Sequence, residues 1–240
     1  MVSDGLVMTE TGTPTGLVKP QPTQKAPNST RRRGRPPSNA ALSVDEDRLL
    51  AAVFKMFSMR GYDATLLREL SRELGVSHNL LNVRFGKKRD IWMAAVDWRF
   101  ARASQNVIAA FEGTGGPEER LRSLIARFCE WAVVNPDVMS LSYWEGQEAS
   151  WRLDHIVDEF IAPFKLRLDA LLEELRLERP VHQISTTALM AMLVQGVGFY
   201  FAARPLQEKL GDEKNLSEEH QLAQARILGD FITSGLLSRG

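Results

Sequence analysis

Side chains that can bind a phosphate or a base edge are concentrated in two stretches of the N-terminal half. The first is Arg31-Arg32-Arg33-Gly34-Arg35-Pro36-Pro37, which gathers guanidinium groups around one glycine. The second begins at Ser77 and ends at Lys88, and its polar side chains include His78, Asn79, Asn82 and Arg84. Guanidinium groups bind phosphate oxygens, and amides and guanidiniums also pair with the edges of bases. Both stretches therefore predict binding to nucleic acid.

Two short helices joined by a glycine turn would position the second stretch. The first of them carries leucines at helical spacing: Leu66, Leu67, Leu70 and Leu74. Gly75 is suited to the left-handed turn that ends a helix, and Ser77 can cap the helix that follows. Two helices with such a turn form a helix-turn-helix, whose second helix enters the DNA major groove. The pattern predicts a regulator that binds double-stranded DNA.

The charge distribution supports this prediction although the net charge of the 240 residues is zero. Residues 1–90 hold 15 Lys and Arg against 9 Asp and Glu, and residues 91–240 hold 15 against 21. A basic DNA-facing half joined to an acidic half would show this asymmetry, although modest solvated charges would show it too.

Motifs of common enzymes are absent from the sequence. There is no Gly-x-Ser-x-Gly elbow and no Gly-x-Gly-x-x-Gly run, and Phe85-Gly86-Lys87-Lys88 lacks the first glycine and the Ser or Thr of a P-loop. The histidines at 78, 155, 182 and 220 do not fall at metal-ligand spacing with another His or Cys. We therefore expect no enzyme, no cofactor and no metal.

Cysteine usage and hydropathy predict a cytoplasmic protein without a membrane span. The single Cys129 excludes an intramolecular disulfide and fits a reducing compartment. Asp4 interrupts the N-terminus, so no secretory signal is expected. The most apolar run, Ala188 to Ala203, contains Gln195 and two glycines and is shorter than a span of about 20 residues.

Residues 1–40 are rich in Pro, Thr, Gly and Ser, and we expect them to be a disordered arm. Its basic segment resembles an AT-hook, whose Arg-Gly-Arg-Pro core, here Arg33, Gly34, Arg35 and Pro36, lies in a narrow A·T minor groove. Gly34 would let the backbone approach the groove floor, and the arginines would meet the negative potential there. The alternative is a generic basic tail that contacts phosphates loosely.

Helical periodicity without strand-like alternation predicts an all-α protein. We expect a helix-turn-helix domain over residues 43–90, with Thr65 as the N-cap of its second helix, and a helical domain over residues 91–240. The helices expected in the second domain cover Lys88 to Phe111, Glu118 to Val134, Ser150 to Leu177 with a kink at Pro163, and Ser217 to Leu237. A further helix is expected to begin at His182 or Ser185 and to reach Ala203. Residues 137–146 are expected to be less regular, and residues 206–215 to be a charged loop.

The run Thr65…Gly75-Val76-Ser77-x-x-Leu80-Leu81-x-x-x-Phe85-x-x-Lys88, together with Arg60-Gly61-Tyr62 before it, resembles the DNA-binding head of the tetracycline-repressor (TetR) family. The resemblance covers about residues 45–95. It implies a homodimer whose N-terminal three-helix heads read half-sites, and a C-terminal domain that binds a small apolar effector and controls the spacing of the heads.

The same resemblance implies roles for individual residues. Thr65 and Lys88 would contact phosphates, while His78, Asn79 and Arg84 would lie on the recognition helix. The chain departs from the family where Asn82 replaces the usual Tyr. A short amide reaches less far than a phenol, so Asn82 either reads a base or leaves the head with weaker affinity.

Two surfaces are expected in the C-terminal domain. A ligand cavity would be lined by Phe100, Phe128, Trp131, Met139, Tyr143, Trp144 and Phe164, with Tyr143, Gln147 or His155 as polar anchors. The dimer interface would include Leu189, Leu193, Gly196, Tyr200, Leu228 and Phe231 from the last two helices. The alternatives are a filled aromatic core and ordinary packing within one chain.

Two other functions remain open beside a ligand-released repressor. One is an architectural DNA-binding protein without ligand control. The other is a TetR-like protein whose DNA binding is weakened, which the departure at Asn82 suggests.

Overall fold

The computed structural model describes residues 46–211 and 217–238, and all regular elements within them are helices. In chain order they are α1 (Glu46–Ala64), α2 (Leu67–Glu73), α3 (His78–Phe85), α4 (Lys88–Ile108), the 3-10 turn η1 (Ala109–Glu112), α5 (Pro117–Val134), α6 (Pro136–Glu145), α7 (Trp151–Ile156), the π-helical η2 (Val157–Ile161), α8 (Ala162–Glu178), α9 (Thr186–Ala191), the π-helical η3 (Met192–Gly198), α10 (Phe199–Ala202), α11 (Arg204–Lys209) and α12 (Glu218–Leu237). The predicted all-α class is confirmed. The predictions for the arm, including Arg33, Gly34 and Arg35, fall outside the described residues.

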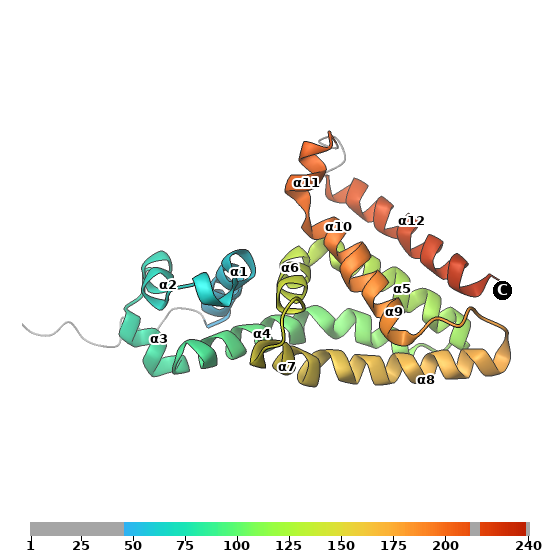
Figure 1. Cartoon of the computed structure of the whole chain (residues 1–240), viewed down its shortest axis with the longest axis horizontal. Helices are drawn as coiled ribbons and strands as arrows, with labels where there is room; N and C mark the ends of the chain where they lie inside the picture. Colours follow the sequence, from blue (N-terminus) through green and yellow to red (C-terminus); the bar gives the residue numbers. More distant parts are fainter. Residues whose placement is uncertain (1–45, 212–216, 239–240) are drawn as a thin grey trace, which may run out of the picture. The chain divides into compact units, whose positions relative to one another are not determined.

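Helices α1 to α3 and the first turns of α4 form a small unit, called the head below (Figure 1). The buried face of α1 consists of residues at helical spacing: Leu49, Leu50, Val53, Phe54 and Phe57. Gly61 adopts a φ of 75°, which interrupts the helix and lets the ring of Tyr62 stack on that of Phe57 with centroids 5.9 Å apart. Leu70 of α2 and Leu81 of α3 are fully buried in the same core.

The turn between α2 and α3 has the predicted helix-turn-helix geometry. Gly75 has a φ of 65°, in the left-handed region that favours glycine. The backbone N–H of Val76 donates to the carbonyl of Ser71 at 3.0 Å, and the hydroxyl of Ser77 accepts from the N–H of Leu80 at 3.1 Å. The predicted cap at Ser77 is confirmed, and these bonds fix the direction in which α3 leaves the turn.

Helix α4 connects the head with the rest of the chain, called the body below (Figure 1). Near its start, Ile91, Trp92 and Ala95 are fully buried, and α4 packs against α1. Further along, Phe100 and Val107 are buried, and the helix packs against α5. One helix thus contributes to both cores, so a movement of its first turns relative to the body requires repacking.

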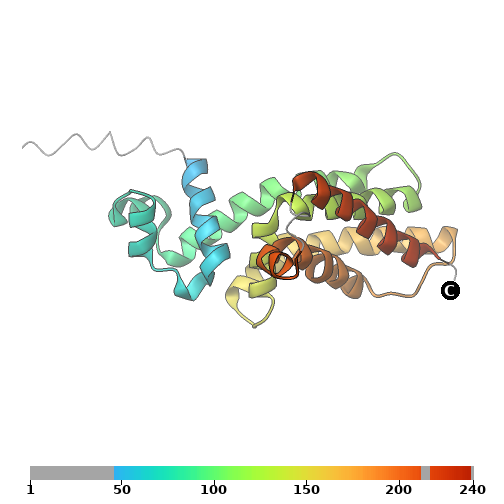
Figure 2. The same ribbon diagram turned by 90° about the horizontal axis from the view of Figure 1, so that it is seen from above.

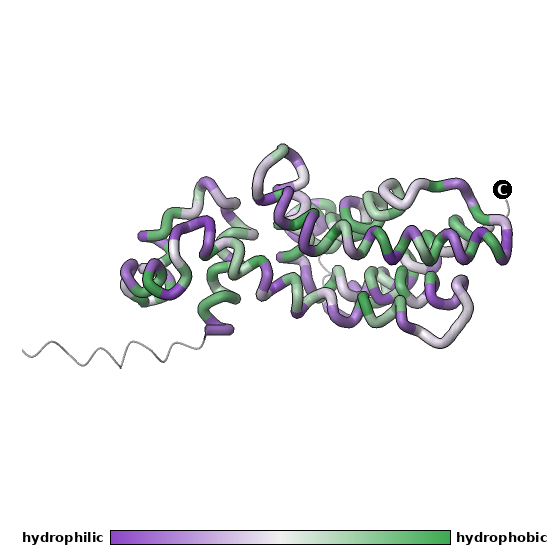
Figure 3. The backbone as a smooth tube through the Cα atoms, turned by 90° about the horizontal axis from the view of Figure 1, so that it is seen from below, coloured by the Kyte–Doolittle hydropathy of each residue, from purple (hydrophilic) through white to green (hydrophobic). Residues whose placement is uncertain are grey.

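The body is organised around α5, which packs against α4, α8, η3 and α12. Figure 2 shows α12 running beside α5, and Gly229 of α12 faces Ala126 and Cys129 of α5 at this contact. Hydrophobic and hydrophilic residues alternate along the long helices of the body (Figure 3), as expected for helices with one buried face.

Three expectations about the elements are wrong. Residues 136–145 form α6 rather than an irregular piece, because Pro136 occupies the first turn, where its missing N–H costs no hydrogen bond. Helix α11 occupies residues 204–209, part of which was predicted as a loop. The second helix is capped by Leu66 and not by Thr65.

The expected kink at Pro163 takes the form of a π-helical segment. Proline lacks an N–H, so the carbonyl of Glu159 cannot receive the usual α-helical bond from residue 163. The N–H of Ala162 instead donates to the carbonyl of Val157, one residue further back than in an α-helix. Segment η2 therefore carries one surplus residue between α7 and α8.

Candidate nucleic-acid interface and ligand cavity

The outer face of α3 is the candidate surface for reading bases. Leu81 is buried, whereas His78, Asn79, Asn82 and Val83 are exposed. Val83 is 76% exposed and was not predicted as a site residue, although its position one residue after Asn82 could have indicated it. Helix α3 therefore presents a compact set of two amides, one imidazole and one apolar side chain.

His78 and Asn82 form a pair on this face. Nδ2 of Asn82 lies 3.0 Å from Nδ1 of His78, one helical turn away. With the amide nitrogen of Asn82 as the donor, Nδ1 of His78 is the acceptor of this bond. The carbonyl oxygen of Asn82 and Nε2 of His78 remain available to a ligand. Both groups belong to the same hydrogen-bonded pair of side chains.

Arg84 does not join this face. Its guanidinium forms an ion pair with Glu46 at the start of α1, with Nη2 and Oε2 2.5 Å apart, and it also lies 5.7 Å from the ring of Phe85. The ion pair keeps the guanidinium beside α1. Arg84 lies on α3 as expected, but this ion pair would have to open before its guanidinium could contact DNA.

Thr65 is fully buried, and its hydroxyl donates to the carbonyl of Gly61 at 2.7 Å. The prediction of a phosphate contact and of an N-cap at Thr65 is wrong, because the chain break at Gly61 leaves a carbonyl that the hydroxyl satisfies. Leu66 takes the N-cap position with 56% exposure and no side-chain hydrogen bond.

The N-terminus of α4 carries two lysines with different surroundings. Lys88 folds back onto the head, with Nζ 4.3 Å from the centre of the Tyr62 ring and 3.4 Å from the carbonyl of Asp63. Burial lowers the pKa of Lys88. Lys87 is exposed, and its backbone N–H donates to the Asp90 carboxylate at 2.8 Å. Lys87 is therefore the more accessible cation at the point where the resemblance implies a phosphate contact by Lys88.

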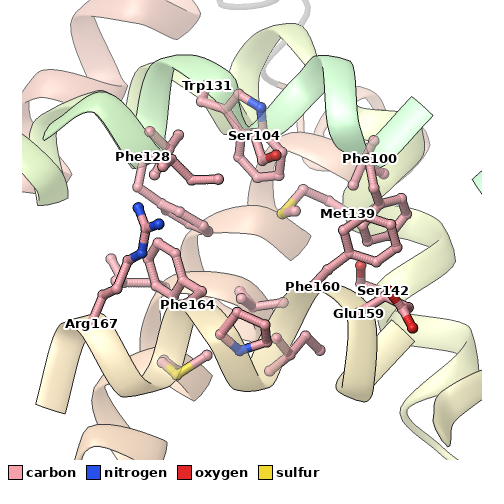
Figure 4. A pocket seen from close by; sticks show the side chains of 18 residues that line it. Phe100, Ser104, Phe128, Trp131, Met139, Ser142, Glu159, Phe160, Phe164 and Arg167 are labelled. Carbon is pink, nitrogen blue, oxygen red and sulfur yellow. The ribbon is translucent and has the colours of Figure 1, made fainter. Parts of the chain in front are cut away.

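A cavity of about 200 Å³ lies inside the body (Figure 4). Its lining residues come from α4, α5, α6, η2, α8, α9 and η3: Phe100, Ser104, Val107, Ile108, Phe128, Trp131, Val138, Met139, Ser142, Glu159, Phe160, Ile161, Pro163, Phe164, Arg167, Met190, Leu193 and Val194. Five of the predicted residues are among them: Phe100, Phe128, Trp131, Met139 and Phe164. The prediction thus found the aromatic wall of the cavity.

The predicted polar anchors lie elsewhere. Tyr143 packs on Phe199, with ring centroids 5.1 Å apart, and Trp144 is 61% exposed beside a second hollow next to Arg60 and Arg152. His155 pairs with Asp97 at 2.7 Å, and Gln147 donates to the carbonyl of Tyr143.

The polar residues that line the cavity are Ser104, Ser142, Glu159 and Arg167, none of which was predicted from the sequence. Helical spacing could have found one of them, since Phe160, Phe164 and Arg167 follow one another at i, i+4 and i+7.

Helix α7 joins the cavity to the head. The ring of Trp151 lies 5.3 Å from that of Tyr62 and 5.2 Å from that of Trp92. Arg152 pairs with the buried Glu145 at 2.6 Å and lies over Tyr62 at 5.0 Å. The helical path that starts in this cluster continues through η2 into the cavity wall, although α7 itself does not line the cavity.

The residues predicted for the dimer interface have different environments. Leu189 and Leu193 are buried within the chain, so the prediction is wrong for these two. Tyr200 and Leu228 are half-buried, while Gly196 is exposed and Phe231 is 76% exposed. Other large exposed apolar side chains on the same two segments are Met192, Phe199 and Ile227.

The described residues contain no group of three or more His, Cys, Asp or Glu arranged to hold a metal ion. In the same part of the chain, no helix is both long and apolar enough to cross a membrane.

Residues 49–95 match the family described as bacterial regulatory proteins, tetR family. The matched segment covers most of α1, all of α2 and α3, and the first turns of α4. The HTH-type transcriptional regulator HbdR of Aromatoleum sp. (strain CIB) is 30% identical over 102 residues, which are 42% of this chain and 44% of that relative. The alignment therefore spans less than half the length of this curated relative.

Solved structures share the fold over most of the chain. A TetR family regulator, PfmR of Thermus thermophilus, has a TM-score of 0.61 at 18% identity, covering 83% of this chain and all of that one. The regulator FadR of Bacillus subtilis, solved with stearoyl-CoA, has a TM-score of 0.58 at 12% identity, covering 80% of this chain and all of that one. At these identities the likeness shows the fold, and the family match and the curated relative both point to a DNA-binding transcriptional regulator.

Proposed function

We propose that this protein is a homodimeric, sequence-specific DNA-binding transcriptional regulator of the TetR type, a repressor released by a small apolar ligand. The observation that carries the proposal is a helix-turn-helix, matched by the tetR family over residues 49–95, whose second helix exposes His78, Asn79, Asn82 and Val83. The proposed domains are an arm over residues 1–40, a DNA-binding domain over 43–90, and an effector-binding and dimerisation domain over 91–240.

In this proposal α3 lies in the major groove. Asn79 is the residue best suited to pair with adenine, since an amide offers one donor and one acceptor to N7 and N6. Val83 is suited to the methyl group of thymine beside it. Lys87 contacts a backbone phosphate and sets the register of the helix without reading sequence.

Dimerisation uses the exposed apolar side chains of the last segments. Soluble monomers rarely leave several large apolar residues exposed together. Met192 and Phe199 lie on η3 and α10, and Ile227 and Phe231 lie on α12. Pairing these segments with their copies in a second chain would bury them in a four-helix interface.

Ligand control uses the cavity and α7. A ligand that fills the cavity displaces side chains such as Phe160, and the same helical path carries Trp151 into the head. The neighbour FadR holds stearoyl-CoA, which supports an effector with an apolar portion for this fold. The displacement would change the separation of the two heads, and with it the fit to half-sites.

Two other functions are weighed against the repressor. An architectural DNA-binding protein would use the head and arm without a ligand, and the aromatic cavity argues against it. A TetR-like protein with weakened DNA binding is suggested by Asn82, but the ordered His78–Asn82 pair argues that the face remains organised. We do not propose a catalytic function. We propose a cytoplasmic location, because a single cysteine fits a reducing compartment.

The test is binding to the DNA upstream of the protein's own coding sequence, measured by fluorescence anisotropy. We expect specific binding that Asn79→Ala weakens by about 1–3 kcal/mol, since a base-reading amide is lost. Asn106→Ala is the matched control, because Asn106 is an exposed amide on α4 outside the head. No specific binding by the full chain would overturn the proposal.

A second measurement separates the remaining functions. Deleting residues 1–40 should reduce the salt dependence of binding by a few units of slope if the arginines of the arm touch phosphates. Binding that persists in the presence of every cavity ligand would favour the architectural function.

A further inference from the structure

At the rim of the apolar cavity lies one exposed cation, Arg167, which has no ion-pair partner among the described residues. Arg167 lies on the same face of α8 as Phe164, and in Figure 4 its guanidinium stands between Phe128 and Phe164 at one end of the cavity. No ion pair or hydrogen bond joins Arg167 to any other residue of the described ranges 46–211 and 217–238. By contrast Arg176, further along the same helix, pairs with Glu173 at 2.5 Å.

The rim at the opposite end of the cavity carries an exposed carboxylate. Glu159 and Ser142 lie there, on the far side of Phe160 from Arg167 (Figure 4). Eight residues of helix separate Glu159 from Arg167, which corresponds to about 12 Å along the axis. The cavity thus has a positive end and a negative end with aromatic rings between them.

The middle of the cavity suits an aromatic body. The rings of Phe128 and Trp131 lie 5.3 Å apart, and those of Phe100 and Phe160 lie 5.0 Å apart. Aromatic rings pack on one another in such tilted arrangements. An apolar cavity of about 150 Å³ can hold benzene, so the 200 Å³ here suits one substituted ring.

A buried donor adds a second polar feature. Nε1 of Trp131 is buried and has no hydrogen-bond acceptor among the residues that the structure describes. A buried donor without an acceptor is unfavourable, so a ligand that brings an acceptor close to this indole gains affinity.

We propose that the effector is a carboxylic acid with an aromatic body, whose carboxylate pairs with Arg167 and whose ring lies among Phe100, Phe128 and Phe160. The proposal rests on the proposed function, in which this cavity is the effector site. A guanidinium binds a carboxylate through two parallel N–H bonds, and this geometry selects the anion over a neutral group of the same size. Glu159 disfavours a second negative charge at the other end of the ligand.

The test compares three probes with the same body: 3-phenylpropionate, 3-phenylpropan-1-ol and 3-phenylpropylamine. Isothermal titration calorimetry of the full-length protein without DNA measures their affinities. We expect the carboxylate to bind about tenfold more tightly than the alcohol. The amine can pair only with Glu159 at the other end, so it should bind less tightly than the carboxylate. Arg167→Gln should abolish the preference for the carboxylate and leave the affinity for the alcohol unchanged.

Charge reversal gives a stricter test. Arg167→Glu should invert the order, so that the amine becomes the best of the three probes. Arg127→Gln is the matched control, because Arg127 is an exposed arginine on α5 next to Phe128 that does not line the cavity. This control should keep the order of the unsubstituted protein, and circular dichroism of each variant verifies the fold.

Several results would overturn the inference: equal affinities for carboxylate and alcohol, an order that Arg167→Gln does not change, or no binding of any probe. Anisotropy on operator DNA separates this outcome from a failure of the proposed function. Carboxylate binding through Arg167 that leaves DNA bound would support the inference and refute release by ligand. DNA release by neutral compounds alone would refute the inference and support the repressor.

Discussion

Asn82 donates a hydrogen bond from its side-chain amide to Nδ1 of His78, one turn earlier on α3, over 3.0 Å. The two side chains therefore form one unit on the exposed face of α3. Nε2 of the imidazole and the carbonyl of the amide both depend on the same bond for their orientation.

We expect the effects of the two residues on DNA binding to be coupled. His78→Ala and Asn82→Ala should each cost about 1–3 kcal/mol of DNA-binding free energy. The double variant should cost less than the sum of the two, because either single change already disorders the other side chain. Anisotropy titrations of all four proteins complete the cycle, and additive losses would mean that the pair does not act as a unit.

Helix α2 begins with a residue that cannot cap it. Leu66 occupies the N-cap without a side-chain hydrogen bond, and it is exposed, so a replacement meets no steric obstacle. Leu66→Ser should raise the free energy of unfolding by about 0.5–2 kcal/mol, because its oxygen accepts from a free N–H of the first turn. Urea denaturation measures the change. Leu66→Ala removes the same apolar surface without adding an acceptor, and an equal gain from this control would refute the capping explanation.

The proposed dimer depends on exposed apolar side chains of α12. Phe231→Glu places a carboxylate at a side chain that is 76% exposed in the single chain, so the change should leave the fold intact. We expect the dimer to dissociate at micromolar concentration, because a charge would be buried in the interface. Sedimentation velocity measures the mass. The control is Leu177→Glu on α8, since Leu177 is 89% exposed and lies outside the proposed face.

Two glycines of η3 should respond in opposite ways to the same added methyl group. At Gly198 a Cβ would lie 2.3 Å from Sδ of Met139, so Met139 must move towards the cavity that it lines. We expect Gly198→Ala to lower stability by about 1–3 kcal/mol and to weaken cavity ligands.

At Gly196 a Cβ would meet nothing within 4 Å. Gly196→Ala should therefore stabilise the chain by about 0.5–1 kcal/mol, because alanine is the better helix former. Thermal unfolding of both variants with and without ligand tests the contrast, and a loss of stability at Gly196 would contradict it.

Cys129 links stability to pH. Burial raises the pKa of the Cys129 thiol to about 12, from an ordinary value of 9.0. The unfolded chain therefore ionises at a lower pH than the folded protein, and the contribution of the thiol to stability is complete below pH 9 and is lost as the pH rises towards 12. Unfolding free energies at pH 8 and at about pH 10.5 should differ more for the unsubstituted protein than for Cys129→Ala. If this difference is the same in both proteins, folding does not raise the pKa of the Cys129 thiol.

The turn of the helix-turn-helix in the head could be predicted from the types and spacing of neighbouring residues. The glycine turn at Gly75 and the cap at Ser77 depend on neighbours in sequence, so their roles could be inferred from residue types and spacing. Thr65 shows the limit of that reasoning. Whether a threonine hydroxyl caps the next helix or bonds back to Gly61 depends on where the preceding helix breaks, which spacing does not specify.

The features that were not predicted depend on contacts between residues far apart in the sequence. The position of Arg84 depends on Glu46, 38 residues earlier, and no periodicity relates the two. The aromatic wall of the cavity followed from apolar spacing, but its charged ends did not, because Glu159 and Arg167 resemble ordinary solvated residues in sequence. Leu189 and Leu193 resemble interface residues for the converse reason, since an apolar stripe does not indicate whether the partner is the same chain or another.

The surplus residue of η2 allows the helix between the cavity and the head to transmit a rotation. Moving a π-turn by one position along a helix rotates the side chains that it passes by about 100° and translates them by about 1.5 Å. Phe160 lies within this turn, and Trp151 lies on the helix just before it, held between the rings of Tyr62 and Trp92. In the proposed function, a ligand that displaces Phe160 would therefore act on the head by rotation, without lengthening or breaking the helix between them.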